Sequence, residues 1–237
     1  HVAVRRQRQM CIRDRFVGGA PIQNIGAYGV EIKDVFVSCS GYSLNTIEKK
    51  KFKLNDCQFS YRSSIFKKSL RNQFIITEVV LQLSKTNHKI SKSYNSIKDA
   101  MNKKKIQNPT IKDIASIVSE IRENKLPNPY LIGNSGSFFK NPIVTIELLN
   151  KLKKKFSKLV YFKESVSKYK LSAAWLIENC GFKNNEEKNV GVYRNQALVI
   201  INLGNATGKE ILLFSKKIKS TVLEKFDILL EEEVNII

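Results

Sequence analysis

The stretch "GNSGSFFKNP" at residues 133–142 places a serine, Ser137, between a glycine and two adjacent phenylalanines. A nucleophilic serine needs a base to remove its proton and a third group to orient that base. The chain has two histidines, His1 at its start and His88 in the polar stretch "KTNHK", and neither is placed like such a base. The stretch also lacks the last glycine of the G-x-S-x-G nucleophile motif. We therefore expect Ser137 to donate a proton, with a turn cap as the structural alternative.

A second stretch that could do chemistry is "GGAPIQNIGAYGVEI" at residues 18–32. It combines four glycines with Gln23 and Asn24 just ahead of an expected strand. Glycine-rich backbone lets main-chain amides approach a large polar ligand closely. The stretch does not match G-x-G-x-x-G at the start of a helix, so a Rossmann dinucleotide site is not indicated.

The four cysteines, at positions 11, 39, 57 and 180, lie far apart and form no C-x-x-C pair. This spacing indicates reduced thiols in a cytoplasmic protein, and it predicts neither a metal site nor a disulfide framework. No apolar run approaches the length of a membrane span, so we expect no membrane association.

A formal net charge of +20 could favour nucleic-acid binding, because a clustered basic face neutralises phosphates. Residues 1–15 hold five arginines against one aspartate, but the remaining excess is mostly lysine spread along the chain. Dispersed lysine is typical of solvated helix faces, and no RNP, KH, zinc-finger or helix-turn-helix signature accompanies it. We expect no nucleic-acid partner and keep such binding as a lesser alternative. Residues 1–15 resemble a non-native leader, because they lack the apolar core of a secretory signal.

The elements that position these stretches change in kind along the chain. Between residues 30 and 83, the stretches "VEIKDVFVS", "YSLNTIE" and "FIITEVVLQL" are rich in branched and aromatic residues and predict strands. Further strands are predicted at "NQALVIINLG" and at the closing "FDILLEEEVNII", which carries three consecutive glutamates.

Helices are expected after residue 109. Thr110 with Asp113 predicts a helix start, and "KLPNP" ends that helix because proline cannot continue it. "LSAAWLIENCG" predicts a short helix closed by Gly181, and Thr207 with Glu210 predicts a capping box. Helical spacing assigns three apolar faces: Ile111, Ile114, Val118 and Ile121; Leu149, Leu152, Phe156 and Leu159; and Ile211, Phe214, Ile218 and Val222.

Several motifs of this chain closely resemble those of the MurB family, the UDP-N-acetylenolpyruvoylglucosamine reductases, in its longer-looped form. They occur in the family's order at near-family spacings and cover almost everything from Pro21 to the end. The motifs are "PIQNIGAYG" (21–29), "FSYRSSIFK" (59–67), "KLPNP" (125–129), "GNSGSFFKNP" (133–142), "AAWLIE" (173–178), "RNQALVIIN" (194–202) and "EKFDILLEEEV" (224–234).

The resemblance implies an α+β fold, in which part of an FAD-binding domain of the vanillyl-alcohol-oxidase (PCMH) type joins a C-terminal α+β substrate-binding domain. We expect these domains at 16–126 and 127–225, and a strand at 226–237 that returns to the active site. The family uses FAD and NADPH to reduce the enolpyruvyl ether of UDP-N-acetylglucosamine to UDP-N-acetylmuramate in peptidoglycan synthesis. The resemblance also implies a cytoplasmic monomer.

The resemblance assigns roles to particular residues. It implies that Arg62, Ser137 and Glu233 are catalytic, and that Tyr94, Lys125 and Asn141 bind substrate. Flavin contacts carry over to the whole 21–29 segment: Pro21, Ile22, Gln23, Asn24, Ile25, Gly26, Ala27, Tyr28 and Gly29.

The chemistry of the implied reaction calls for these residue types. Hydride addition to the enolpyruvyl group builds negative charge on the neighbouring carbon and its carboxylate. An arginine binds a carboxylate bidentately, and a carboxyl group can complete the hydrogen bonding. A serine hydroxyl can then supply the single proton that the enolate carbon needs. Each residue also has a structural alternative: a surface ion pair for Arg62, a solvated charge for Glu233 and a helix-terminal cation for Lys125.

The chain departs from the family ahead of "PIQNIGAYG". Family members carry there a glycine-rich segment and part of the flavin domain, and "FVGGA" at 16–20 resembles the tail of that segment. We therefore expect a truncated member that purifies without flavin or expresses poorly. The alternative within the same fold is another flavoprotein oxidoreductase, which would not need Arg62, Ser137 and Glu233 together.

Overall fold

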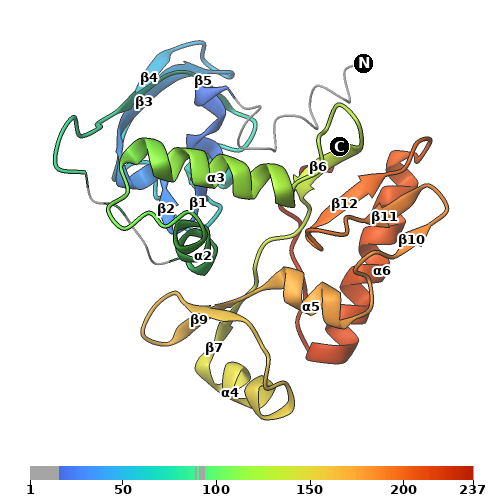
Figure 1. Ribbon diagram of the computed structural model, residues 1–237. Coiled ribbons are helices and arrows are strands. Elements are labelled where there is room, and N and C mark those ends of the chain that lie inside the picture. Colours follow the sequence, from blue (N-terminus) through green and yellow to red (C-terminus); the bar gives the residue numbers. More distant parts are fainter. Residues whose placement is uncertain (1–15, 89, 91–93, 237) are drawn as a thin grey trace. The chain divides into compact units, whose positions relative to one another are not determined.

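The computed structural model describes residues 16–88, 90 and 94–236, and this part of the chain divides into two compact units (Figure 1). The N-terminal unit holds the described residues up to Arg122, and the C-terminal unit begins at Glu123. Each unit combines helices with antiparallel sheets around its own apolar clusters. The expected α+β class is confirmed. The expected leader at 1–15 lies outside the described residues.

The main sheet of the N-terminal unit has the strand order β4-β3-β5, and both pairings are antiparallel. Its strands are β3 (Phe36–Ser43), β4 (Lys49–Lys53) and β5 (Phe74–Leu81). Phe36 and Cys39 of β3 are buried in one apolar cluster with Phe66, and the rings of Phe52 and Phe74 meet edge to face at 5.0 Å. Burial of these aromatic side chains stabilises one face of the sheet.

The second expected strand lies later in the sequence than its branched residues suggest. "YSLNTIE" supplies the end of β3 and then a turn, in which Ile47 has a φ of 59° and is 75% exposed. The strand itself is "KKKFK", whose Phe52 packs into the core while its lysines are exposed. Lysines are common on edge strands because they discourage pairing with other chains. A prediction based on branched and aromatic residues does not detect such a strand.

A small hairpin and short 3₁₀ helices complete this part of the N-terminal unit. The hairpin pairs β1 with β2 in antiparallel fashion. Pro21 opens one of the 3₁₀ helices, where its fixed φ and missing N–H are tolerated. The elements are η2 (Val17–Gly19), η3 (Pro21–Gln23), β1 (Gly26–Ala27), β2 (Val30–Glu31), η4 (Ile32–Asp34) and η5 (Ile65–Lys67).

The helices α2 (Asn95–Lys103) and α3 (Ile111–Lys125) share a second apolar cluster, in which Ile97, Met101 and Ile117 are buried. The sequence places Ile111 on the apolar face of α3, but its side chain is 51% exposed. The buried stripe is instead centred on Ile117, with Ile114, Val118 and Ile121 packed beside it.

Both ends of α3 are confirmed. The Thr110 N–H donates to Asp113 Oδ2 at 2.7 Å, and the Asp113 N–H donates to Thr110 Oγ1 at 3.3 Å. This reciprocal pair satisfies N–H groups that have no partner inside the helix. The helix ends at Lys125, two residues before Pro127.

The C-terminal unit contains an antiparallel sheet of order β10-β11-β12-β6 and another of order β7-β9-β8. The long helix α6 packs along the first sheet, against β11 and β12 (Figure 1). The expected strand at "NQALVIINLG" is confirmed as β12. The strands are β6 (Gly133–Ser137), β7 (Ile143–Thr145), β8 (Tyr161–Lys163), β9 (Lys168–Leu171), β10 (Glu186–Glu187), β11 (Val190–Val192) and β12 (Val199–Asn202).

The helices of the C-terminal unit are α4 (Ile146–Lys155), α5 (Ala173–Asn179) and α6 (Gly208–Phe226). The capping box is confirmed, because Thr207 and Glu210 exchange hydrogen bonds of 2.7 and 3.2 Å. Gly181 follows α5 with a φ of 83°, as the expected C-cap requires. The apolar spacing from 149 to 159 overstates α4, because Leu159 is buried from the loop that follows the helix.

The end of the chain is not the strand that the sequence predicts. Asp227 ends α6 in the left-handed conformation, and the following residues make an isolated bridge between Glu232 and Phe139. Each helix in the described part of the chain is too short or too polar to span a membrane.

Candidate functional site

The 21–29 segment forms a compact turn in the N-terminal unit. After η3, Asn24 adopts the left-handed conformation with a φ of 46° and turns the chain toward β1. Tyr28 and Gly29 connect β1 to β2 with φ values of 53° and 82°, the signs required in a two-residue hairpin turn of type I′. Gly29 and Val30 are exposed at the tip of this hairpin.

Arg62 lies in a two-residue turn between Ser60 and Ser63, whose main-chain groups bond each other at 3.0 and 3.1 Å. Its φ of 52° is left-handed, which costs a residue with a side chain about 1–2 kcal/mol. The Arg62 Nη2 donates to the Gly26 carbonyl at 2.9 Å. The guanidinium carbon also lies 5.4 Å from the centre of the Tyr61 ring. Residues in strained conformations cluster at functional sites, so the position of Arg62 is consistent with a role beyond an exposed ion pair.

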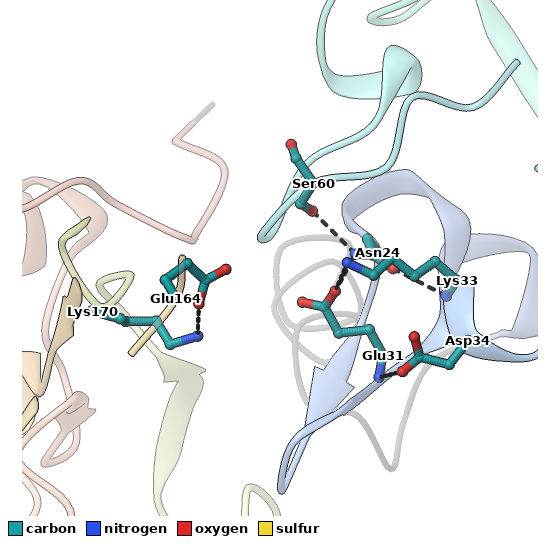
Figure 2. Close-up of polar contacts among 7 residues, drawn as sticks. All are labelled: Asn24, Glu31, Lys33, Asp34, Ser60, Glu164 and Lys170. Atoms are coloured by element: carbon teal, nitrogen blue, oxygen red, sulfur yellow. Dashed lines mark hydrogen bonds and ion pairs between the residues drawn. The ribbon is translucent and has the colours of Figure 1, made fainter. Parts of the chain in front are cut away.

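The "PIQNIGAYG" and "FSYRSSIFK" motifs bond directly to each other, and Figure 2 shows one of these bonds, between Asn24 and Ser60. Side-chain hydrogen bonds join segment 22–26 to segment 60–64, and we call the following three of them the clasp. They are Asn24 Nδ2 to the Ser60 carbonyl at 3.1 Å, Arg62 Nη2 to the Gly26 carbonyl at 2.9 Å, and Ser64 Oγ to the Ile22 carbonyl at 2.6 Å. The sequence motifs gave no sign of this contact, because each motif was assigned its own role.

Tyr94 immediately precedes α2 and packs against the hairpin. Its ring meets that of Tyr28 edge to face, with centroids 5.4 Å apart. Burial raises the pKa of the Tyr28 phenol, an effect that the positive charge of Arg122 opposes and Tyr94 adds to. The N-terminal unit therefore gathers three of the sequence-predicted features: the 21–29 segment, Arg62 and Tyr94.

Ser137 is the last residue of β6, beside a break in strand register. Ser137 pairs with Val199 and Asn134 pairs with Ile201, so β6 carries one extra residue opposite β12. Gly136 lies in this bulge with a φ of 73°. Bulges of this kind re-aim side chains and are frequent beside active sites. Phe138 and Phe139 follow and are buried in the main core of the unit, which confirms that they anchor the loop.

Glu233 lies on the segment that bonds to this loop. The Glu233 N–H donates to the Phe138 carbonyl at 2.8 Å, and the Lys140 N–H donates to the Glu231 carbonyl at 2.9 Å. The tertiary structure therefore brings the backbones of Ser137 and Glu233 to neighbouring positions.

The other two glutamates of the "EEE" stretch are held by lysines of the same unit. Glu231 forms an ion pair with Lys140, and Glu232 forms one with Lys219 at 2.8 Å. These pairs hold the segment at Glu232, which forms the bridge to Phe139, and at the residue before it.

Two further predicted residues, Asn141 and Lys125, have structural roles in the C-terminal unit. The Asn141 Oδ1 accepts a hydrogen bond from the Ala173 N–H at 2.9 Å, which ties the loop after Ser137 to the first residue of α5. Lys125 is exposed at the C-terminal end of α3, where a cation interacts favourably with the helix dipole. Neither observation tests substrate binding, so these two roles stay predictions. Among residues 16–88, 90 and 94–236, no three metal-binding side chains come together.

The chain is similar to a protein family and to curated proteins of known name. The profile of a protein family described as "UDP-N-acetylenolpyruvoylglucosamine reductase, C-terminal domain" matches residues 128–237. Two curated proteins named UDP-N-acetylenolpyruvoylglucosamine reductase match along 93% of the chain. The one from Flavobacterium johnsoniae is 50% identical over 221 residues, and the one from Amoebophilus asiaticus is 45% identical over 221 residues. The matches cover 66% and 65% of these relatives, so the chain spans just under two thirds of their length.

A solved structure has the same fold. The crystal structure of UDP-N-acetylenolpyruvylglucosamine reductase (MurB) from Thermus caldophilus is similar with a TM-score of 0.58 at 20% sequence identity. The similarity covers 92% of this chain and 59% of that one. Because 93% of this chain matches a curated reductase at 50% identity, the chain belongs to the UDP-N-acetylenolpyruvoylglucosamine reductase (MurB) family.

Proposed function

We propose that this chain carries the catalytic residues of an FAD-dependent enzyme that uses NADPH to reduce UDP-N-acetylglucosamine enolpyruvate to UDP-N-acetylmuramate, a step of peptidoglycan synthesis. The observation that carries the proposal is the bond from the Glu233 N–H to the Phe138 carbonyl at 2.8 Å. It places a carboxyl-bearing residue next to the loop that holds Ser137, as the reduction of an enolpyruvyl ether requires. Because NADPH and nucleotide sugars are found in the cytoplasm, we infer that the reaction takes place there.

The 21–29 segment suits a large, flat cofactor with polar edges. Gly26, Ala27 and Gly29 carry small side chains or none, so the backbone of the hairpin can approach a ring system closely. Pro21, Gln23 and Asn24 are buried within their own unit, which leaves contacts with FAD to Ile22 and residues 25–29 in this proposal. When bound, FAD supplies the hydride that it receives from NADPH.

In the proposed reaction, Arg62 binds the carboxylate of the enolpyruvyl group. A guanidinium offers two parallel N–H donors to a carboxylate and keeps its charge at any physiological pH. As hydride reaches the methylene carbon, negative charge develops on the adjacent carbon and on this carboxylate. A fixed positive charge at that place lowers the barrier, because it interacts more strongly with the transition state than with the substrate.

Ser137 then transfers its hydroxyl proton from Oγ to the enolate carbon. Its position is held by the bulge at Gly136 and by the burial of Phe138 and Phe139, which also limits access of water. Glu233 completes the hydrogen bonding around the developing charge. We further propose that Tyr94, Lys125 and Asn141 contact the nucleotide part of the substrate, where a cation would meet the diphosphate.

The test uses a chimera in which the matched segment of this chain replaces its counterpart in the Flavobacterium johnsoniae relative. The purified chimera should retain FAD, and its NADPH oxidation at 340 nm should increase several-fold when UDP-N-acetylglucosamine enolpyruvate is added. The chain by itself is measured in parallel by its visible absorbance after FAD is added.

A chimera that holds flavin but shows no stimulation by the enolpyruvyl nucleotide would contradict the proposal. That result would favour another flavoprotein oxidoreductase of the same fold. The Ser135→Ala chimera serves as a control, because Ser135 lies in the same strand and has no role in the proposed reaction.

A further inference from the structure

The amide of Asn24 makes hydrogen bonds through both of its polar atoms inside the N-terminal unit (Figure 2). The Nδ2 group donates to the Ser60 carbonyl at 3.1 Å and to Glu31 Oε2 at 2.9 Å. The Oδ1 atom accepts the Lys33 N–H at 3.2 Å. The residue is completely buried, at 0% exposure, so these bonds are made without competition from water.

These bonds leave the Asn24 side chain little to offer a ligand. A primary amide has two N–H donors, and both are used by Ser60 and Glu31. A residue that contacts a cofactor through its amide would direct at least one donor or acceptor away from the chain. The sequence motif groups Asn24 with flavin contacts, whereas its bonds connect it to the turn that carries Arg62.

We propose that Asn24 is a positioning residue for Arg62. Its amide holds the Ser60 carbonyl, which is also the acceptor of the Ser63 N–H, and these two residues fix both ends of the Tyr61–Arg62 turn. The inference rests on the proposed function of Arg62 as the carboxylate-binding residue. It assigns Asn24 a role in the geometry of the site and none in contact with the substrate or the cofactor.

The residue type meets two requirements at once. A φ of 46° at position 24 suits glycine, asparagine and aspartate, since other side chains are strained there. Glycine has no amide, and aspartate has no N–H to donate to Ser60 and Glu31. Of these three residue types, asparagine alone satisfies both the backbone and the clasp.

Charged residues next to Glu31 also help to hold the Asn24 amide in place. Glu31 Oε2, which accepts from Asn24, lies 2.8 Å from Lys33 Nζ. The Glu31 N–H donates to Asp34 Oδ2 at 2.8 Å at the start of η4 (Figure 2). A shift of Asn24 would therefore disturb several bonds together, which favours one fixed position for the Ser60 carbonyl.

The first measurement is amide hydrogen exchange on the chain by itself. Asn24→Asp replaces an N–H donor with a carboxylate oxygen that faces the Ser60 carbonyl and the Glu31 carboxylate. We expect the Ser63 N–H to exchange at least about tenfold faster, while the amides of β3 exchange at their original rates. Asn24→Gly should have the same effect without adding charge. It replaces Asn24→Asp in the test if the aspartate variant does not fold. Asn72→Asp is the matched control, because Asn72 is also left-handed, with a φ of 60°, but exposed.

The second measurement separates the two half-reactions in the chimera by stopped flow. Asn24→Asp should slow the oxidation of reduced flavin by the enolpyruvyl nucleotide at least about tenfold, with flavin reduction by NADPH changed less than about twofold. In an Arg62→Ala background, Asn24→Asp should cause no further loss, because a residue that acts through Arg62 has nothing left to position.

The outcomes decide between three explanations. Unchanged exchange at Ser63 would overturn the proposal, and so would equal losses in both half-reactions or loss of flavin, which would make Asn24 a cofactor-binding or generally structural residue. Full activity of the Arg62→Ala chimera would instead refute the proposed function of Arg62. The exchange of Ser63 would then decide alone whether Asn24 holds the turn.

Discussion

The two groups of predicted site residues are held in place by different forces. In the N-terminal unit, Arg62 lies on a left-handed turn that is fastened by the three hydrogen bonds of the clasp within the described residues. In the C-terminal unit, Ser137 and Glu233 lie on backbone segments that bond each other over the buried Phe138 and Phe139. A hydrogen bond contributes about 1 kcal/mol net, whereas truncating a buried phenylalanine costs about 3–5 kcal/mol. The first group should therefore be sensitive to polar substitutions and the second to changes in packing.

The largest expected effect is the loss of packing behind Ser137. Phe139→Ala should lower the free energy of unfolding of the C-terminal unit by about 3–5 kcal/mol, because Phe139 is 1% exposed and leaves a cavity when truncated. Urea denaturation measures the change, and the exchange of the Ser63 amide should stay as it is. Tyr130→Ala, at a side chain that is 72% exposed, should change stability by less than about 0.5 kcal/mol. Equal effects of the two substitutions would show that the burial of Phe139 does not stabilise the C-terminal unit.

Removing the proposed proton donor should have the next largest effect. In the chimera, Ser137→Ala should reduce oxidation of reduced flavin by the enolpyruvyl nucleotide about a hundredfold or more, because the enolate loses its acid. Flavin reduction by NADPH does not use this proton and should change little. If stopped-flow traces show both half-reactions slowed to the same extent, Ser137 is a structural residue.

Changing the cation in the N-terminal unit should have a smaller effect. Arg62→Lys keeps the positive charge but loses the two-donor fork, so the substrate half-reaction should fall about tenfold or more while flavin is retained. Arg71→Lys, on the exposed turn before β5, is the control and should leave both half-reactions unchanged. Normal turnover in the Arg62→Lys chimera would mean that the carboxylate is bound elsewhere.

The smallest effect is expected for an ion pair beside Glu233. Lys219 and Glu232 are 23% and 21% exposed and lie 2.8 Å apart, so Lys219→Gln should cost less than about 1 kcal/mol of stability. Turnover should be almost unchanged, since the backbone bond from Glu233 to Phe138 holds the segment. A tenfold loss of turnover without a loss of stability would show that the C-terminal group also depends on single polar contacts.

Most of the confirmed predictions from the sequence rest on local rules. The capping pairs Thr110–Asp113 and Thr207–Glu210 were predictable because each needs only two residues three positions apart. The end of α3 was predictable because proline cannot continue a helix, and the anchoring role of Phe138 and Phe139 followed from two large apolar side chains in a glycine-rich loop. The matches of Arg62, Ser137 and Glu233 to a family came from whole motifs, and their catalytic roles stay predictions.

Errors occurred where tertiary contacts override local preference. "KKKFK" has a poor strand propensity, but pairing with β3 and the burial of Phe52 make it the edge strand. The chain end pairs with the Ser137 loop through a single bridge, between Phe139 and Glu232, and the Lys140 N–H to Glu231 carbonyl bond follows it before β7 begins at Ile143. Ile111 has the right spacing for the apolar face of α3 but begins the helix outside the cluster.

The sequence by itself determined which residue types are available for chemistry and which segments form helices, because propensity, capping and periodicity act over a few neighbouring residues. Only the tertiary structure decided that Asn24 bonds to Ser60, 36 residues away, and that the Glu233 N–H donates to the Phe138 carbonyl. Hydrogen bonds between distant segments form when burial excludes water and leaves each polar group to find a partner inside the protein. No pattern within a single motif contains that information, because Asn24 and Ser60 belong to different motifs.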